Sequence, residues 1–219
     1  MIFDLFRKKQ GELPEYWQEY EQKFKAEPPT FAEESTFVVL DTETTGFHPR
    51  KDRMLCIGAV KISSNTIEVN SAFEVYLEQE EFNPETVEIH GILKNEKTPR
   101  ISEEKAIREF LNYIGNSILV AHHASFDIRM INEALRRLQL PKLKNTVLDT
   151  GVLYRRTRIN SNLVNRDRGY TLDEIAEAYS IDTRDRHTAA GDAFITAIAF
   201  LKILGRLKKD SRLKLKDLF

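Results

Sequence analysis

Three apolar runs stand out in the first third of the chain, separated by polar turns. Residues 36–40, 54–62 and 66–77 are rich in branched and aromatic side chains, which is typical of buried strands. The second and third runs are separated only by residues 63–65, and strands joined by so tight a turn must pair antiparallel. This part of the chain therefore predicts a meander of three strands.

The chain then alternates between helical and strand-like patterns. Apolar residues recur on one helical face over residues 106–114, and 125–138 is a second helical stretch. Residues 117–121 and 145–148 are short apolar runs of strand length. The alternation predicts strands that run parallel to one another and are connected by helices.

Two further helices follow. Thr171 with Glu174 three residues later forms a capping box that opens one of them, and the last long helix runs over about residues 188–204. A meander followed by alternating helices and strands predicts an α/β fold, with a mixed sheet of three antiparallel strands followed by parallel strands, flanked by helices.

Both ends of the chain differ from its middle. Residues 1–33 are charged and aromatic, and Trp17, Tyr20 and Phe24 fall at helical spacing, so we expect a helical N-terminal extension. Residues 206–219 carry six lysines or arginines, which predicts a basic C-terminal tail. The length of 219 residues suits one domain, expected over residues 34–205.

The composition of the chain excludes few classes of protein. Lys and Arg total 33 against 34 Asp and Glu, so the net charge of −1 does not indicate a nucleic acid partner. Cys56 is the single cysteine, which excludes an intramolecular disulfide. The chain has no apolar stretch of the roughly 20 residues that cross a bilayer and no signal-peptide pattern, so we expect a cytoplasmic protein without a membrane partner.

Two carboxylates mark the end of the first strand. Asp41 and Glu43 are two residues apart, which is the period of a strand, so both project from one face. Hard divalent cations such as Mg²⁺ take oxygen ligands of this kind. A solvated surface pair is the alternative, but the pair follows an apolar strand and precedes the turn at residues 44–46, where glycine lets the backbone approach a ligand.

Two more carboxylates and a histidine lie at helix starts. Asp127 falls in the first turn of the helix after the fourth strand, where Ser125 is the expected cap, and its alternative role is to complement the helix dipole. Asp192 stands early in the last, largely apolar helix, so a carboxylate facing inward there needs a cation or a hydrogen-bonding partner. His187 precedes it, and histidine titrates near neutrality.

Three segments together resemble one known family. They are residues 37–47, which contain Asp-Thr-Glu-Thr-Thr-Gly, residues 120–127, which contain Ala-His-His-Ala, and the pair His187 and Asp192. In this order they are similar to the motifs of the DEDDh (DnaQ-like) 3′-5′ exonuclease superfamily, most of all to its epsilon proofreading subunits of bacterial DNA polymerase III. The resemblance covers about residues 35–204 and implies a ribonuclease H-like fold, with the exonuclease domain at 34–205.

The resemblance implies a role for each matching residue. Asp41, Glu43, Asp127 and Asp192 would bind two Mg²⁺ or Mn²⁺ ions, and His187 would be the general base. Histidine can take a proton from water at neutral pH, and two cations can activate that water and stabilise the leaving oxygen. The expected product is a 5′ mononucleotide.

Three further residues are expected to contact the substrate. Thr44 lies on the turn beside the acidic pair, and His90 lies in an Ile-His-Gly-Ile stretch similar to one in proofreading subunits, with an ordinary loop histidine as the alternative. Phe47 could stack on the terminal base, or it could be a plain core residue.

One position departs from the family pattern. The superfamily has asparagine where this chain has His123, which leaves open the hydrogen bonding behind Asp127. His122 is interpreted as structural, and a zinc site formed by the two histidines is not expected because neighbours on a strand point to opposite faces.

The expected partner is the 3′ end of a nucleic acid, with DNA preferred over RNA because Asp-Thr-Glu is closer to proofreading subunits than to oligoribonuclease. An RNA-trimming exonuclease and a non-catalytic polymerase-docking module are the alternatives.

Arginines near the expected site could hold phosphates or form a solvated loop. They are Arg155, Arg156, Arg158, Arg166, Arg168, Arg184 and Arg186. The ending Leu218-Phe219 could dock on a DNA polymerase or a sliding clamp, or the tail could follow the substrate backbone.

Overall fold

A mixed sheet of seven strands forms the centre of the protein in a computed structural model, which describes residues 13–80, 83, 86–88, 91–93, 98–158, 169–208 and 212–219. The strands are β1 (Phe37–Thr44), β2 (Met54–Ser63), β3 (Thr66–Ile67), β4 (Phe73–Leu77), β5 (Arg100–Ile101), β6 (Ile118–Ala121) and β7 (Val147–Asp149). Their order is β5-β4-β2-β1-β6-β7, and β3 pairs with β2 outside this path. β2 pairs antiparallel with β1 and β4, whereas β6 pairs parallel with β1 and β7.

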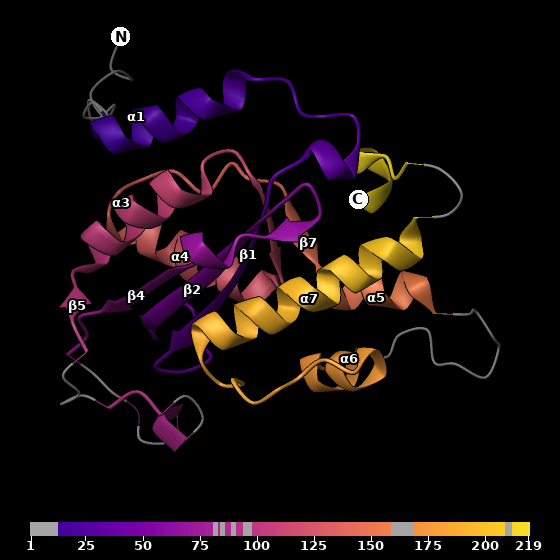
Figure 1. Ribbon diagram of the computed structural model, residues 1–219. Coiled ribbons are helices and arrows are strands. Elements are labelled where there is room, and N and C mark those ends of the chain that lie inside the picture. The colour runs from indigo at the N-terminus through magenta and orange to yellow at the C-terminus, as the bar shows by residue number, and fades with distance from the viewer. Residues whose placement is uncertain are drawn as a thin grey trace, which may run out of the picture.

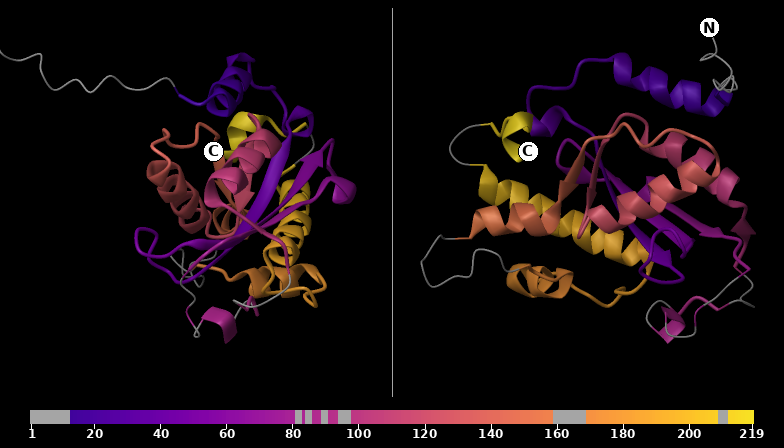
Figure 2. Two further views of the ribbon diagram at one scale, coloured as in Figure 1. Left: turned by 90° about the vertical axis from the view of Figure 1, so that its left-hand side faces the viewer. Right: turned by 180° about the vertical axis from the view of Figure 1, so that it is seen from behind.

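Helices cover both faces of the sheet (Figures 1 and 2). They are α1 (Glu15–Gln22), α3 (Glu103–Ile114), α4 (Ser125–Arg137), α5 (Thr150–Thr157), α6 (Leu172–Tyr179) and α7 (Ala189–Leu207), with short 3-10 turns η1 (Lys23–Lys25), η2 (Ala32–Glu34), η3 (Val69–Ser71) and η4 (Leu215–Leu218). One core joins the sheet to α1, α3 and α4, and a second core joins it to α5, α6, α7 and η4. The molecule therefore has three layers, with the sheet in the middle.

The alternation of side chains along β1 divides its residues between the two cores. Phe37 and Val39 are buried in the core that contains α7, whereas Val38 and Leu40 are buried in the core that contains α4. Continuing this alternation, the odd-numbered carboxylates at the end of the strand face α7. The residue between them, Thr42, faces α4.

The expected fold class is confirmed, with differences in detail. The third expected strand is divided into β3 and β4, because η3 interrupts it at Val69–Ser71. The capping box at Thr171 and Glu174 opens α6 as predicted. The expectation that Ser125 caps α4 is wrong, because Ala124 occupies the cap position and Ser125 is the first helical residue. Within the described residues, we find no helix long and apolar enough to span a membrane.

Both end segments pack against the rest of the fold. In α1, Trp17 and Tyr20 are buried in the core with α3, and the Tyr20 hydroxyl donates a hydrogen bond of 2.6 Å to Asn145 Oδ1. In the tail, Leu215 and Leu218 are buried. The domain boundaries at residues 33 and 205 stay a prediction, but neither segment lies apart from the sheet and its helices.

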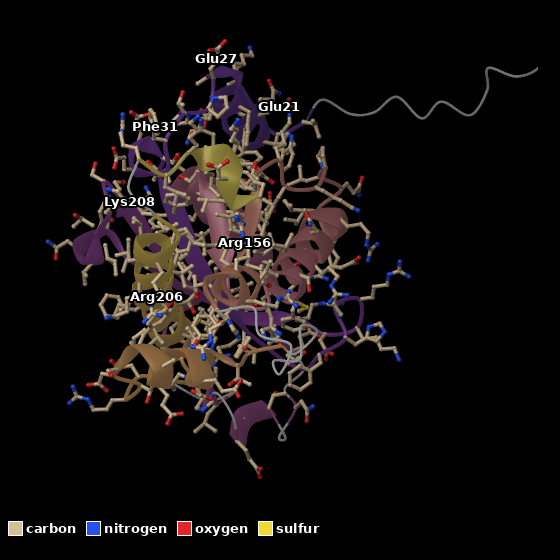
Figure 3. All side chains as sticks on the ribbon, turned by 90° about the vertical axis from the view of Figure 1, so that its right-hand side faces the viewer. Glu21, Glu27, Phe31, Arg156, Arg206 and Lys208 are labelled. Carbon is tan, nitrogen blue, oxygen red and sulfur yellow. The ribbon has the colours of Figure 1, made fainter. Side chains whose placement is uncertain are left out.

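The tail is fastened by both backbone and side chains, and Figure 3 shows this end of the molecule. Phe31 and Lys214 form an isolated antiparallel bridge, and the Arg156 guanidinium donates to the carbonyl oxygens of Asp217 and Leu218. The charged tail therefore folds back onto the body of the protein. The reason is that Leu218 gains a buried position, and Arg156 satisfies the carbonyls beside it.

Candidate active site

The end of β1 presents its two carboxylates toward α7. Asp41 lies opposite Gly58 of β2, and a Cβ atom built on Gly58 would stand 2.2 Å from the carbonyl carbon of Ala189. The first turn of α7 therefore packs directly on the backbone of β2, which only glycine permits. This close approach brings the N-terminal end of α7 beside the acidic end of β1.

Asp192 reaches the same place from the first turn of α7. The helix begins after Thr188, whose hydroxyl accepts a hydrogen bond of 3.1 Å from the Gly191 amide. Oxygen atoms of Asp41, Glu43 and Asp192 lie within 4.8 Å of one another. The structure thus brings together three of the four carboxylates that the sequence singles out.

Asp127 approaches from the other face of the sheet. Its Oδ1 atom accepts hydrogen bonds from the Thr42 amide at 3.1 Å and the Thr42 hydroxyl at 2.7 Å. Thr42 lies between the two acidic residues of β1, so this contact ties α4 to the site. Asp127 is buried and stands next to the three-carboxylate cluster without being one of its members.

Burial and like charges make these carboxylates unusually basic. Burial raises the pKa of Asp41 well above its usual range, and the charges of Asp127, Glu43 and Asp192 raise it further. Burial, with the charges of Asp192 and Asp127, raises the pKa of Glu43 to about 7. Burial also raises the pKa of Asp127 to about 7, although the hydrogen bonds from Thr42 act in the opposite direction.

The cluster fits a hard divalent cation. Its donors are all carboxylate oxygens, which Mg²⁺ and Mn²⁺ prefer. The Oδ1 atom of Asp192 is buried and has no hydrogen-bonding partner within the described part of the chain, which is costly for a carboxylate unless a cation compensates it. The three carboxylates and the unpartnered oxygen of Asp192 therefore support the binding of a metal ion.

The other expected site residues are placed less uniformly. His187 is exposed in the turn before α7, in a left-handed conformation with φ of 65°, and the structure shows no contact between it and the carboxylates. The hydroxyl of Thr44 donates to the Gly46 carbonyl oxygen at 2.8 Å. Because a hydroxyl has only one proton to donate, this side chain is not a donor to substrate while that bond is intact. His90 lies outside the described residues.

Phe47 is not a core residue. Its side chain is 76% exposed, and its ring centroid lies 6.3 Å from that of Phe126. The loop that carries it is held by Asp52, which accepts hydrogen bonds from the Thr45 hydroxyl and the His48 amide. An exposed aromatic ring on an organised loop is suited to stacking on a base.

The two adjacent histidines do not diverge as expected. The rings of His122 and His123 lie 4.4 Å apart, because β6 ends at Ala121 and His123 has a φ of 59°. Histidine is among the non-glycine residues that tolerate this left-handed conformation. Burial lowers the pKa of His122 to about 4, and its Nδ1 atom lies 3.0 Å from the Thr150 hydroxyl.

Asp149, at the end of β7, was not singled out from the sequence. Its Oδ1 atom accepts hydrogen bonds from the amides of Gly151 and Val152, and its Oδ2 atom accepts one from the Ala124 amide. Asp149 therefore caps α5 and also fixes the turn that begins α4. Its position directly before a helix was the only sequence sign of a capping role.

Three arginines of the cluster are bound away from the carboxylates. Arg156 holds the tail, Arg158 donates to the Tyr154 hydroxyl, and Arg184 pairs with Asp182. Arg166 and Arg168 lie outside the described residues. Of the ion pairs shown for the described arginines of this cluster, only that of Arg186 reaches a carboxylate of the site.

The sequence is similar to those of known exonuclease and DNA polymerase III proteins. The family model described as "Exonuclease" matches residues 38–200. The chain is 32% identical over 175 residues to the DNA polymerase III subunit epsilon of Aquifex aeolicus, covering 80% of this chain and 83% of that protein. It is 33% identical over 186 residues to the PolC-type DNA polymerase III of Thermotoga petrophila, covering 85% of this chain but only 13% of that larger protein.

Solved structures share the fold at low sequence identity. E. coli Exonuclease I in complex with a dT13 oligonucleotide has a TM-score of 0.66 at 19% identity, covering 78% of this chain and 41% of that chain. Exonuclease X in complex with 5′ overhanging duplex DNA has a TM-score of 0.59 at 22% identity, covering 77% and 91%. These likenesses support the arrangement of sheet and helices described above.

Proposed function

Because the chain belongs to the exonuclease family, we propose that it is a metal-dependent 3′-5′ exonuclease that releases 5′ mononucleotides from single-stranded DNA. The observation that carries the proposal is the convergence of Asp41, Glu43 and Asp192, with a buried oxygen of Asp192 left without a partner. Such a site suits cation-assisted cleavage of a phosphodiester.

Each residue has a distinct part in the proposed reaction. Asp41, Glu43, Asp127 and Asp192 hold two Mg²⁺ or Mn²⁺ ions. Bound there, the ions supply an activated water and stabilisation of charge on the leaving oxygen. His187 accepts the water proton at an unprotonated ring nitrogen, and its exposed position leaves it room to approach bound substrate.

Substrate is held by the rim of the site. Phe47 stacks on the terminal base, and the turn that includes Thr44 approaches the terminal nucleotide with its backbone. His90 remains a candidate contact to the same nucleotide. Stacking does not distinguish DNA from RNA, so the preference for DNA rests on the similarity to DNA polymerase III proteins.

The proposed setting is proofreading or repair in the cytoplasm, in association with a DNA polymerase, as the names of the relatives suggest. Docking on a sliding clamp through Leu218 and Phe219 is disfavoured, because Leu218 is only 2% exposed. A clamp would have to release the tail from its present contacts before it could bind both side chains.

The test is a cleavage assay on matched single-stranded DNA and RNA oligonucleotides, labelled at the 5′ end, with Mn²⁺, Mg²⁺ or EDTA. We expect stepwise shortening from the 3′ end, faster on DNA and absent in EDTA. Asp41→Ala should abolish cleavage, and His187→Ala should slow it by roughly 100-fold.

Several outcomes would count against the proposal. Faster cleavage of RNA would make the protein an exoribonuclease of the same family. Binding of oligonucleotides without any cleavage would favour the non-catalytic docking module. Near wild-type turnover by a folded Asp41→Ala variant would show that the metal site is wrongly assigned.

A further inference from the structure

Arg186 connects the carboxylate cluster to a neighbouring helix. Its Nη1 atom donates to Asp192 Oδ2 at 2.5 Å, while its Nε and Nη2 atoms donate to the two carboxylate oxygens of Asp173 at 2.7 and 3.2 Å. Asp173 is the second residue of α6, and its side chain is 64% exposed. One guanidinium therefore joins the starts of α6 and α7.

The two carboxylate oxygens of Asp192 have different surroundings. Oδ2 is held by Arg186, whereas Oδ1 is buried and has no partner within the described residues. Asp192 belongs to the cluster with Asp41 and Glu43. A carboxylate held by one oxygen presents the other in a fixed direction, which is how neighbouring hydrogen bonds orient metal ligands.

The turn before α7 gives Arg186 little freedom. The Arg186 amide donates to the Thr183 carbonyl oxygen, and the Thr188 hydroxyl donates to the Asp185 carbonyl oxygen. A Cβ atom on Gly191 would stand 1.9 Å from that same Asp185 oxygen, so the turn lies directly against the helix. The Arg186 side chain is only 17% exposed, and both ends of its guanidinium are occupied.

We propose that Arg186 is a positioning residue, which holds Asp192 Oδ2 so that Oδ1 faces the cation, and which is itself anchored on α6 by Asp173. The inference rests on the metal site of the proposed function. It adds a residue outside the carboxylates and the histidine, and it makes α6 part of the support of the site.

The shape of arginine matters for this role. Its planar fork can hold the two oxygens of Asp173 and one oxygen of Asp192 at the same time, whereas a lysine ammonium is a point charge that fixes no plane. A purely electrostatic counter-ion would instead compete with the cation for Asp192. The two roles predict opposite changes in metal affinity when the guanidinium is removed.

The experiment measures Mn²⁺ binding to the full chain by isothermal titration calorimetry, without substrate. Arg186→Gln should raise the Mn²⁺ dissociation constant by roughly 10- to 100-fold, the usual effect of losing a residue that orients a metal ligand. Arg186→Lys should bind Mn²⁺ more weakly than the wild type, because the charge is kept but the fork is lost. Cleavage by Arg186→Gln should recover toward the wild-type turnover rate as Mn²⁺ is raised, which a general loss of structure would not allow.

Two further variants make the result specific. Asp173→Asn touches no carboxylate of the cluster, yet it should weaken Mn²⁺ binding in the same direction by a smaller factor, and its effect should not add to that of Arg186→Gln. Arg212→Gln is the matched control, because Arg212 also pairs with two carboxylates, Glu33 and Glu34, in the terminal segments. It should leave Mn²⁺ affinity unchanged.

Unchanged or tighter Mn²⁺ binding by Arg186→Gln, or wild-type binding by Arg186→Lys, would overturn the positioning role. If circular dichroism shows that Arg186→Gln does not fold, the Asp173→Asn variant provides the test. Wild-type Mn²⁺ affinity in that variant refutes the proposal. A wild-type protein that binds no Mn²⁺ would refute the proposed metal site as well, so the two failures are distinguishable.

Discussion

Single residues decide how the carboxylate cluster responds to protons and cations. Asp41, Glu43 and Asp127 all have raised pKa values, with burial as the largest cause and neighbouring carboxylates adding to it. The folded protein therefore favours the protonated carboxyl forms when no cation is present. A cation reverses this preference, because it favours the ionised forms.

This linkage predicts the pH dependence of stability. Glu43 and Asp127 have pKa values of about 7 in the folded protein, compared with about 4 for unfolded carboxyl groups. Between about pH 4 and pH 7 the folded state holds protons that the unfolded state has released, so the free energy of unfolding in EDTA should fall as pH rises. Thermal unfolding with and without Mn²⁺ should show a larger stabilisation by the cation at pH 8 than at pH 5.

A Glu43→Gln variant provides the control for this prediction. It removes one of the titrating groups, so the loss of stability between pH 4 and pH 7 in EDTA should become smaller. A wild-type protein whose unfolding temperature in EDTA is constant, or rises, over this pH window would contradict the linkage.

At the scale of elements, the site depends on how closely α7 approaches β2. Gly58 on β2 lies against the backbone of Ala189 and Ala190, and it stands opposite Asp41 in the β1–β2 pairing. The distance between the carboxylate of β1 and that of α7 is therefore set by a position without a side chain.

Gly58→Ala should separate these two elements. The added methyl group would overlap the backbone of α7, so we expect a loss of stability of about 1–3 kcal/mol. The cleavage rate should fall by more than the fraction of unfolded protein accounts for. Gly205→Ala on the same helix is the matched control. It meets no atom within 4 Å and should stabilise the protein by about 0.5–1 kcal/mol through helix propensity. Equal behaviour of the two variants in urea unfolding and cleavage assays would contradict this explanation.

At the scale of the whole molecule, the two end segments fasten to each other and to the body of the fold. The Ala32 amide donates to the Leu213 carbonyl oxygen and the Leu215 amide to the Thr30 carbonyl oxygen, so residues far apart in sequence form a short ladder. Arg212 pairs with Glu33 and Glu34 beside it. The tail thus contributes to the stability of the fold at the end of the sheet opposite the acidic end of β1.

The last two residues should therefore differ in their effect on stability. Leu218 is 2% exposed and Phe219 is 59% exposed. We expect Leu218→Ala to lower the free energy of unfolding by about 2 kcal/mol, near the low end for a buried leucine because the tail can rearrange, and Phe219→Ala to change it little. Urea titrations of both variants test this, and equal midpoints would show that the tail does not pack as described.

The sequence by itself determined the class of fold and the identities of the carboxylates. Continuous apolar runs of strand length, a tight turn at residues 63–65 and a capping box at Thr171 are local patterns, and local patterns specify strands, turns and helix starts. The spacing of Asp41 and Glu43 fixes them on one face, because strand geometry requires it. Their chemistry then indicates a hard cation.

Only the tertiary structure decided which distant residues meet. The Thr42 bond to Asp127, the Arg186 bridge between Asp173 and Asp192, and the buried place of Leu218 join segments whose sequences contain no sign of one another. The close approach of the His122 and His123 rings depends on a single left-handed residue after the strand end. Such contacts depend on how layers pack and on where the backbone turns, so the periodicity of one segment cannot predict them.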